Sequence, residues 1–206
     1  MKLEPKLIDV AVPANPDGAV LVLHGGAQRR EAMAVSPTQL SVLRMVPIAR
    51  RIARRDRRRL AVFRLLNSAR GWDTRHTPLH DATWALAQIA DRLGDGIPSC
   101  LVGHSLGGRA ALLSAGRPGV RGVVALAPWV YPDDLPSGLS DQRVLILHGS
   151  ADRIASPTRS AAVARALSRR VPVEHVVVEG GRHAMLRHGR RFVVPAADFA
   201  VEVLLG

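Results

Sequence analysis

The sequence is short of cysteine, and it lacks any long hydrophobic run. Cys100 is the only cysteine among 206 residues, so no disulfide can form within the chain. Its place in an apolar stretch predicts a small buried side chain. No apolar run approaches the roughly 18 residues needed to cross a bilayer, and the first residues lack the apolar core of a secretory signal. We therefore expect a cytoplasmic protein with no membrane span.

Acidic and aromatic residues are also scarce. The chain has 29 lysines and arginines against 17 acidic residues, a net charge of +12, and only 3% aromatic residues. Much of the excess positive charge lies in the run 50–59. Such a run could bind nucleic acid, anionic lipid or a phosphorylated substrate. No aromatic residue interleaves with this run, as a groove for single-stranded nucleic acid requires. We interpret the run as the solvated C-terminal end of a helix, where cations are favourable, and expect no nucleic-acid partner.

Apolar runs of strand type alternate along the chain with amphipathic stretches of helix type. The predicted strands are 7–12, 19–24, 60–65, 99–102, 122–127, 143–148 and 172–178. The predicted helices are 37–55 (kinked or restarted at Pro47), 78–93, 109–113, 157–169 and 194–205. This alternation predicts an α/β fold, with residues 1–206 forming a single domain around a mostly parallel sheet covered by helices on both faces. The connection 128–142 is too short for more than a loop, so we expect no lid domain.

A glycine-rich turn, 103–108, joins the predicted strand 99–102 to a predicted helix. A serine at such a turn holds its hydroxyl exposed above the edge of the sheet. Gly103 and Gly107 flank Ser105 where strand and helix pack too closely for side chains. The sequence therefore predicts Ser105 as a nucleophile.

A serine hydroxyl is a weak nucleophile at neutral pH, and histidine is a suitable base because its pKa lies near neutrality. Of eight histidines, His183 follows the last predicted strand directly and is preceded by glycines, so we predict that it is the base. Three others that end strands, His24, His104 and His148, are expected to hydrogen-bond neighbouring loops. The alternative is that these three and Asp152 bind a metal, but they lack tight ligand spacing. We expect no metal and no cofactor.

The base needs an acidic partner that fixes its tautomer and stabilises the imidazolium. Asp152 follows the penultimate predicted strand and should emerge beside the loop of His183. It could instead be a turn or helix-entry residue, and then Asp133 or Asp134 would be the acid.

The oxyanion of an acyl-transfer intermediate needs preorganised N–H donors. The N–H group of Leu106, at the start of the helix after the serine, is one candidate. The second should come from the glycine-rich loop after the strand 19–24, through Gly26 or Ala27.

Four motifs together resemble those of the α/β-hydrolases, in particular the small lidless esterases, lysophospholipases and dienelactone-hydrolase-like members. They are HGG at 24–26, the serine turn at 103–107, HGSAD at 148–152 and GGRH at 180–183. The resemblance spans nearly the whole chain and implies the order serine, acid, histidine found in that fold. The sequence departs from the family by having HGGA rather than HGGG in the oxyanion loop. Only one strand candidate precedes Ala19, so the sheet is expected to lack the first strand of the fold.

These residues predict a serine hydrolase that cleaves a small or short-chain carboxylic ester or thioester through an acyl-serine. An amidase, peptidase or acyltransferase could use the same triad, and a non-catalytic binder of small molecules could retain the fold. Four side chains on strand-end loops are candidates to line an acyl pocket: Met33, Trp72, Trp129 and Tyr131. Alternatively, the two tryptophans plug the top of the core.

Overall fold

A seven-stranded sheet, in the order β1-β3-β2-β4-β5-β6-β7, forms the centre of the computed structural model, which describes residues 3–26 and 33–206. Its strands are β1 (Lys6–Ala11), β2 (Gly18–Leu23), β3 (Leu60–Leu66), β4 (Ser99–His104), β5 (Val120–Leu126), β6 (Arg143–Gly149) and β7 (Val173–Val178). The β1 strand pairs antiparallel with β3, and every other neighbouring pair is parallel. This confirms the predicted mostly parallel sheet. The single strand before β2 also fits the expectation that the first strand of the fold is missing.

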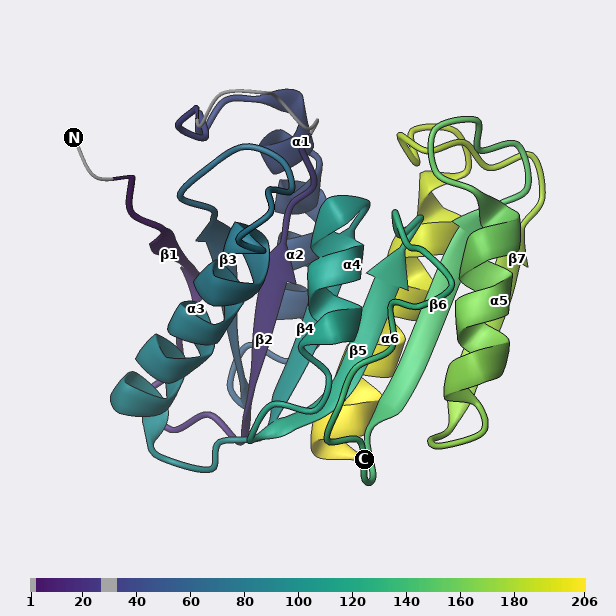
Figure 1. Cartoon of the computed structure of the whole chain (residues 1–206). Helices are drawn as coiled ribbons and strands as arrows, with labels where there is room; N and C mark the ends of the chain where they lie inside the picture. The colour runs from purple at the N-terminus through teal and green to yellow at the C-terminus, as the bar shows by residue number, and fades with distance from the viewer. Residues whose placement is uncertain (1–2, 27–32) are drawn as a thin grey trace.

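Helices cover both faces of this sheet, as predicted. They are α1 (Leu40–Leu43), α2 (Met45–Arg55), α3 (Thr77–Leu93), α4 (Leu106–Leu113), α5 (Pro157–Leu167) and α6 (Gly189–Leu205). In Figure 1, α3, α4 and α5 lie on one face, and α2 and α6 lie on the other. The buried side chains accordingly form two large clusters, one on each side of the sheet.

The central strands show why their sequences are almost wholly apolar. Every residue of β2 is buried. Leu21 and Leu23 belong to the cluster shared with α3, α4 and α5, whereas Val20 and Val22 belong to the cluster shared with α2 and α6. Successive side chains of a strand point to opposite faces, so a strand covered on both faces needs apolar residues at every position.

Three helices differ by three residues or more from their predicted bounds, and α4 is one of them, since it begins at Leu106 rather than at residue 109. The stretch 37–55 forms two helices joined at Arg44, and Pro47 lies in the first turn of α2, where its missing N–H is not needed. The last helix begins at Gly189 rather than near residue 194. Pro195 suggests a helix start in the sequence, but the helix accommodates it as an interior residue.

The carboxyl ends of the parallel strands lie together at one edge of the sheet, the upper edge in Figure 1, where the loops that could carry a site converge. The connection from β5 to β6, which the structure describes in full, contains no helix. This edge therefore has no lid domain inserted after β5. Among the described residues, none of the helices combines the length and apolar character needed to cross a membrane.

Candidate active site

The backbone of Ser105 is held in an unusual conformation between β4 and α4. Its φ is 57° and its ψ is −120°, a combination that a residue with a side chain rarely adopts and that is found mainly at functional sites. A Cβ atom at Gly103 would lie 2.1 Å from the carbonyl oxygen of Gly107, and one at Gly107 would lie 2.5 Å from that of Leu23. Neither position can hold a side chain, because the backbone of α4 contacts that of β4 at Gly103 and that of the end of β2 at Gly107.

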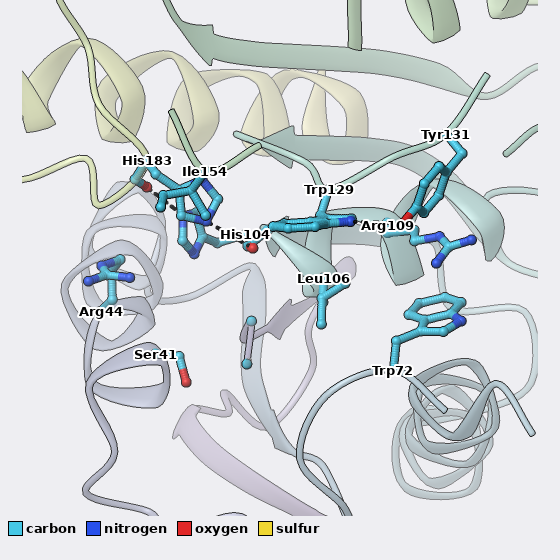
Figure 2. A pocket seen from close by; sticks show the side chains of 13 residues that line it. Ser41, Arg44, Trp72, His104, Leu106, Arg109, Trp129, Tyr131, Ile154 and His183 are labelled. Carbon is cyan, nitrogen blue, oxygen red and sulfur yellow. Dashed lines mark hydrogen bonds between the residues drawn. The ribbon is translucent and has the colours of Figure 1, made fainter. Parts of the chain in front are cut away.

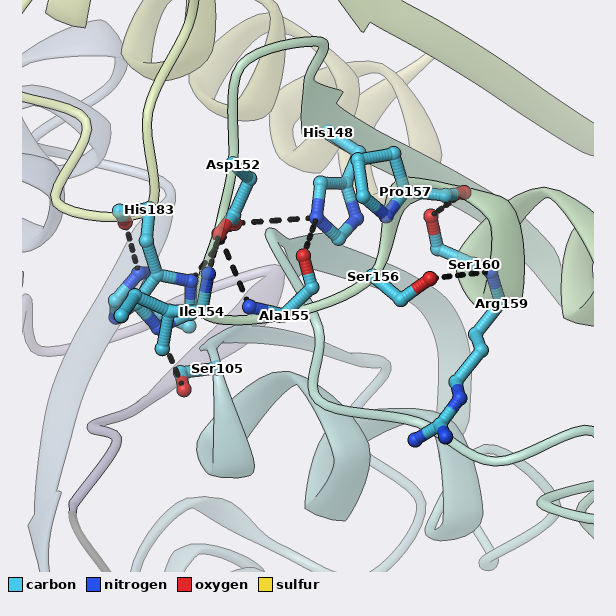
Figure 3. A network of polar contacts seen from close by, with 11 residues as sticks. Ser105, His148, Asp152, Ile154, Ala155, Ser156, Pro157, Arg159, Ser160 and His183 are labelled. Atoms are coloured by element: carbon cyan, nitrogen blue, oxygen red, sulfur yellow. Dashed lines mark hydrogen bonds and ion pairs between the residues drawn. The ribbon is translucent and has the colours of Figure 1, made fainter.

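Three side chains from three different loops form one hydrogen-bonded line (Figure 3). The hydroxyl of Ser105 lies 3.0 Å from Nε2 of His183, and Nδ1 of His183 lies 2.8 Å from Oδ2 of Asp152. The loops after β6 and β7 are also joined through their backbones, since the N–H of Ala151 donates to the carbonyl of Gly181 at 2.9 Å. The structure thus brings together Ser105, His183 and Asp152, the residues predicted as nucleophile, base and acid from three separate strand ends.

The side chain of Asp152 is fully buried and surrounded by donors. Its Oδ1 accepts from the backbone N–H groups of Ile154 at 2.8 Å and Ala155 at 3.0 Å, and its Oδ2 accepts from both His183 and His148. Burial by itself would raise the pKa of this carboxyl, but the hydrogen bonds outweigh burial and hold its pKa well below the usual range. Asp152 is therefore ionised at neutral pH. Its Oδ1 closes a turn, and its Oδ2 accepts a hydrogen bond from His183.

His148 is a second histidine on the same carboxylate. Its side chain is fully buried, and its Nε2 lies 3.2 Å from Oδ2 of Asp152 and 3.3 Å from the carbonyl oxygen of Ala155. Both neighbours are acceptors, so Nε2 carries the proton and donates to them. The sequence prediction expected His148 to contact a neighbouring loop but did not connect it with the acid. The sequence did contain a signal for this contact, because His148 and Asp152 are four residues apart on either side of a turn at the end of a strand.

The other two strand-end histidines contact nearby loops, as expected. Nε2 of His104 donates to the carbonyl of His183 at 2.8 Å, and Nδ1 of His24 donates to that of Gly25 at 2.6 Å. Burial and the neighbouring His183 lower the pKa of His104 to about 3, so this ring is neutral at pH 7. Within residues 3–26 and 33–206, no group of three or more His, Cys, Asp or Glu side chains is arranged to hold a metal ion.

The two alternative acids do not reach His183. Asp134 is buried, and its carboxylate accepts from Arg109 and from the backbone N–H of Tyr131, each at 2.7 Å. Asp133 is exposed to solvent. Of the three candidate carboxylates, Asp152 is the one in contact with His183.

A cavity of about 400 Å³ opens beside Ser105 (Figure 2). Three of the predicted lining residues border it: Trp72, Trp129 and Tyr131. Met33 does not line it. This residue is 41% exposed, and its backbone carbonyl accepts from the N–H of Arg70. The lining also includes residues that the sequence prediction missed: Ser41, Arg44, Arg109 and Ile154.

Arg109 holds the aromatic end of this cavity together. Its guanidinium carbon lies 4.1 Å from the ring centroid of Trp72 and 5.0 Å from that of Tyr131, and the group pairs with Asp134 at 2.7 Å. An arginine between two aromatic rings is stabilised by their π faces, and this one is only 14% exposed. No sequence pattern indicated this role, because an arginine on a short helix normally faces solvent.

The expected oxyanion donors lie on two segments. Leu106 is the first residue of α4 and borders the cavity, and the first N–H groups of a helix have no partner within the helix. Gly26 also borders the cavity. Ala27 lies outside the described residues.

Comparisons with known proteins identify the fold. No protein-family model matches the chain, and no curated protein matches it in sequence. Solved structures do match it over nearly its whole length. Est1E from Butyrivibrio proteoclasticus is 16% identical with a TM-score of 0.68, and the match covers 98% of this chain and 94% of that one. Esterase PE8 is 20% identical with a TM-score of 0.67, covering 99% and 100%.

A third solved structure, an alpha-beta serine hydrolase homologue from Coxiella burnetii, is 17% identical with a TM-score of 0.67, and the match covers 96% of this chain and 90% of that one. The matches cover 90% or more of each of these three chains. The chain therefore has the α/β-hydrolase fold.

Proposed function

We propose that this protein is a serine hydrolase that cleaves small or short-chain carboxylic esters or thioesters, with Ser105 as nucleophile, His183 as base and Asp152 as acid. The observation that carries the proposal is the hydrogen-bonded line from the serine hydroxyl through the imidazole to the buried carboxylate, at 3.0 and 2.8 Å. Nucleophile, base and orienting acid in this geometry are the parts that acyl transfer requires.

The reaction follows from the positions of the protons. Oγ of Ser105 forms a bond to the acyl carbon while its proton passes to Nε2 of His183, and Asp152 stabilises the resulting imidazolium. The carbon–oxygen or carbon–sulfur bond to the leaving group then breaks, and His183 gives its proton to the leaving atom. A water molecule attacks the acyl-serine by the same route, with His183 taking its proton and returning it to Ser105. Asp152 is ionised, so its negative charge faces the proton that His183 accepts during the reaction, and the neutral ring of His104 adds no opposing charge.

The negative charge on the carbonyl oxygen is proposed to be stabilised by the N–H of Leu106 and a second N–H from Gly26 or Ala27. Leu106 and Gly26 both border the cavity beside Ser105, which supports this assignment. Removing one such donor typically costs about 10²–10³ in turnover.

The size of the cavity and the short connection after β5 support a small acyl group. The cavity has a volume of about 400 Å³, close to the lower end of the range found for small-molecule sites. Its lining combines the indole rings of Trp72 and Trp129 with the apolar side chain of Leu106, which suits a short aliphatic or aryl acyl group.

Labelling with a fluorophosphonate tests whether Ser105 is an activated nucleophile. We expect the wild-type protein to be labelled and to hydrolyse p-nitrophenyl butyrate. We expect the Ser105→Ala variant to lose labelling and at least about 10⁴ in kcat/KM. Ser114→Ala is the matched control, because it removes a buried serine hydroxyl from the end of α4, away from the cavity. A wild-type protein that is neither labelled nor active would overturn the proposal.

Chain length tests the substrate class. We expect p-nitrophenyl acetate and butyrate to be hydrolysed in preference to the palmitate, because the cavity cannot enclose a long acyl chain. The reverse preference would contradict the assignment to short-chain substrates.

A further inference from the structure

A second cavity adjoins the first on the side of His183. Its volume is about 460 Å³, and its charged lining consists of three arginines, Arg44, Arg153 and Arg182. Arg44, Ile154 and His183 border both cavities. The two cavities are therefore neighbouring parts of one site, with the imidazole between them.

The three arginines come from separate parts of the chain. Arg44 joins α1 to α2, Arg153 lies in the loop after β6, and Arg182 lies in the loop after β7. Their convergence at the carboxyl edge of the sheet is thus a product of the fold. Local sequence does not place them together.

None of these arginines takes part in an ion pair between described residues. The nearby carboxylate, Asp152, is fully buried and already accepts from two histidines and two backbone N–H groups. By contrast, Arg109 at the other end of the first cavity is paired with Asp134 at 2.7 Å. The Nε atom of Arg44 is also buried without a hydrogen-bond partner among the described residues.

Guanidinium groups have a fixed fork of N–H donors that matches the oxygens of carboxylates, phosphates and sulfonates. Three of them around one cavity, with no described carboxylate to neutralise them, create a positive potential that attracts an anion. The cavity is therefore suited to an anionic group rather than to a neutral chain.

The position of His183 indicates which part of the substrate this group belongs to. His183 hands its proton to the leaving atom, so the leaving alcohol or thiol must lie on the side of the imidazole. In Figure 2, Arg44 lies at the His183 end of the first cavity, and Trp72, Arg109 and Tyr131 lie at the opposite end. The acyl group then fits the aromatic end and the leaving group fits the end with the arginines.

We infer that the cavity lined by Arg44, Arg153 and Arg182 binds an anionic group on the leaving alcohol or thiol. The substrate class is then an acyl ester or thioester with a carboxylate, phosphate or sulfonate on the part that departs. This inference rests on the proposed hydrolase function. Beyond that function, the inference specifies that the substrate carries a negative charge and in which direction the substrate lies across the site.

A matched pair of thioesters tests the inference. Their leaving thiols are 3-mercaptopropanesulfonate, which is anionic, and 3-mercaptopropanol, which is neutral, and both carry a butyryl group. Thiol release measures kcat/KM for each at low ionic strength. We expect the wild-type protein to prefer the anionic thioester by about 10-fold, equivalent to about 1.4 kcal/mol, mainly through KM. Carboxylate and phosphate analogues of the same thioester then rank the anions.

The triple variant Arg44→Gln/Arg153→Gln/Arg182→Gln should reduce this preference to about 1, because the positive charge at the cavity is removed. Arg169→Gln is the matched control. Arg169 is exposed and lies between α5 and β7, near the amino-terminal end of β7 and opposite the site. We expect this control to keep the preference. Equal rates for both thioesters in the wild-type protein, or a preference that survives in the triple variant, would overturn the inference.

Binding to the Ser105→Ala variant separates this inference from the proposed function. Without turnover, the affinities for the two thioesters can be measured directly, and the anionic one should bind about 10-fold more tightly. If both thioesters are hydrolysed at equal rates and bind equally well, the inferred anion site is contradicted, whereas the hydrolase proposal is not. If the wild-type protein hydrolyses neither thioester but the anionic thioester binds more tightly, the hydrolase proposal is contradicted and the anion site is supported.

Discussion

The two sides of His183 are built in opposite ways. On one side, a line of hydrogen bonds runs from Ser105 through the ring of His183 to Asp152 and His148, and both Asp152 and His148 have fully buried side chains. On the other side, Arg153 and Arg182 are exposed and make no ion pair with any described residue. The polar groups on the first side find their hydrogen-bond partners within the protein. The arginines on the second side offer N–H donors that make no ion pair with a described residue.

This difference separates the two tasks of a proposed catalytic site. Groups that stabilise charge in the transition state work best when they are oriented before the substrate arrives, and burial with complete hydrogen bonding achieves that orientation. Groups that select a substrate must keep donors available for it. The contrast predicts that changes on the buried side reduce turnover, whereas changes on the open side alter the choice of substrate.

Among the changes that test this contrast, Asp152→Asn is expected to have the largest effect. An amide cannot stabilise the imidazolium and favours the wrong tautomer of His183, so kcat should fall about 10³–10⁴-fold. The rate of p-nitrophenyl butyrate hydrolysis measures this change. Asp133→Asn is the control, since Asp133 is exposed and follows the neighbouring strand. A loss of less than tenfold in Asp152→Asn would contradict the assigned role.

His148→Phe should have a smaller effect on the same side. It removes one of the hydrogen bonds to Asp152 while keeping a ring in the buried site, so we expect kcat to fall about 10-fold and KM to change little. His175→Phe is the matched control, because His175 lies on the adjacent strand and makes none of the hydrogen bonds to Asp152. An equal loss in both variants would show that His148 acts only through packing.

The pH dependence of stability gives a second measurement for His148→Phe. Because hydrogen bonds depress the pKa of Asp152 below its usual 3.8, its stabilising contribution is present above that pH and is lost as the pH falls toward the lowered pKa. Losing the bond from His148 raises that pKa. The free energy of unfolding in urea should therefore fall less between roughly pH 5 and pH 2 in the variant than in the wild-type protein.

The smallest effect is expected from salt, which should act only on the open side. Raising the salt concentration tenfold, from 0.05 M to 0.5 M NaCl, should lower kcat/KM for the anionic thioester about 3-fold, because exposed charges are screened. The neutral thioester should change by less than about 1.5-fold, since the buried line is screened much less. If salt changes kcat/KM equally for the two thioesters, the proposed difference between the two sides of the site is contradicted.

The comparison also shows which parts of the site could be predicted from sequence. Ser105 was predictable because Gly103 is required where β4 meets the backbone of α4 four residues later, and that requirement is local. The requirement for glycine at 107 comes instead from its contact with the distant end of β2. Asp152 and His183 were predictable because each follows a strand, and parallel strands deliver their carboxyl ends to one edge. The position of Met33 was not predictable, since it depends on the pairing of residues 33–34 with the loop at 69–70.

Periodicity and steric limits between nearby residues were enough to predict the alternation of strands and helices, the turn at Ser105 and the order of the three polar residues. The folded structure was needed to show that His148 shares the carboxylate of Asp152, that Arg109 lies between Trp72 and Tyr131, and that three distant arginines line one cavity. Such contacts depend on the directions of side chains from separate loops. Those directions are set by how the whole sheet and its helices pack, and no local pattern encodes them.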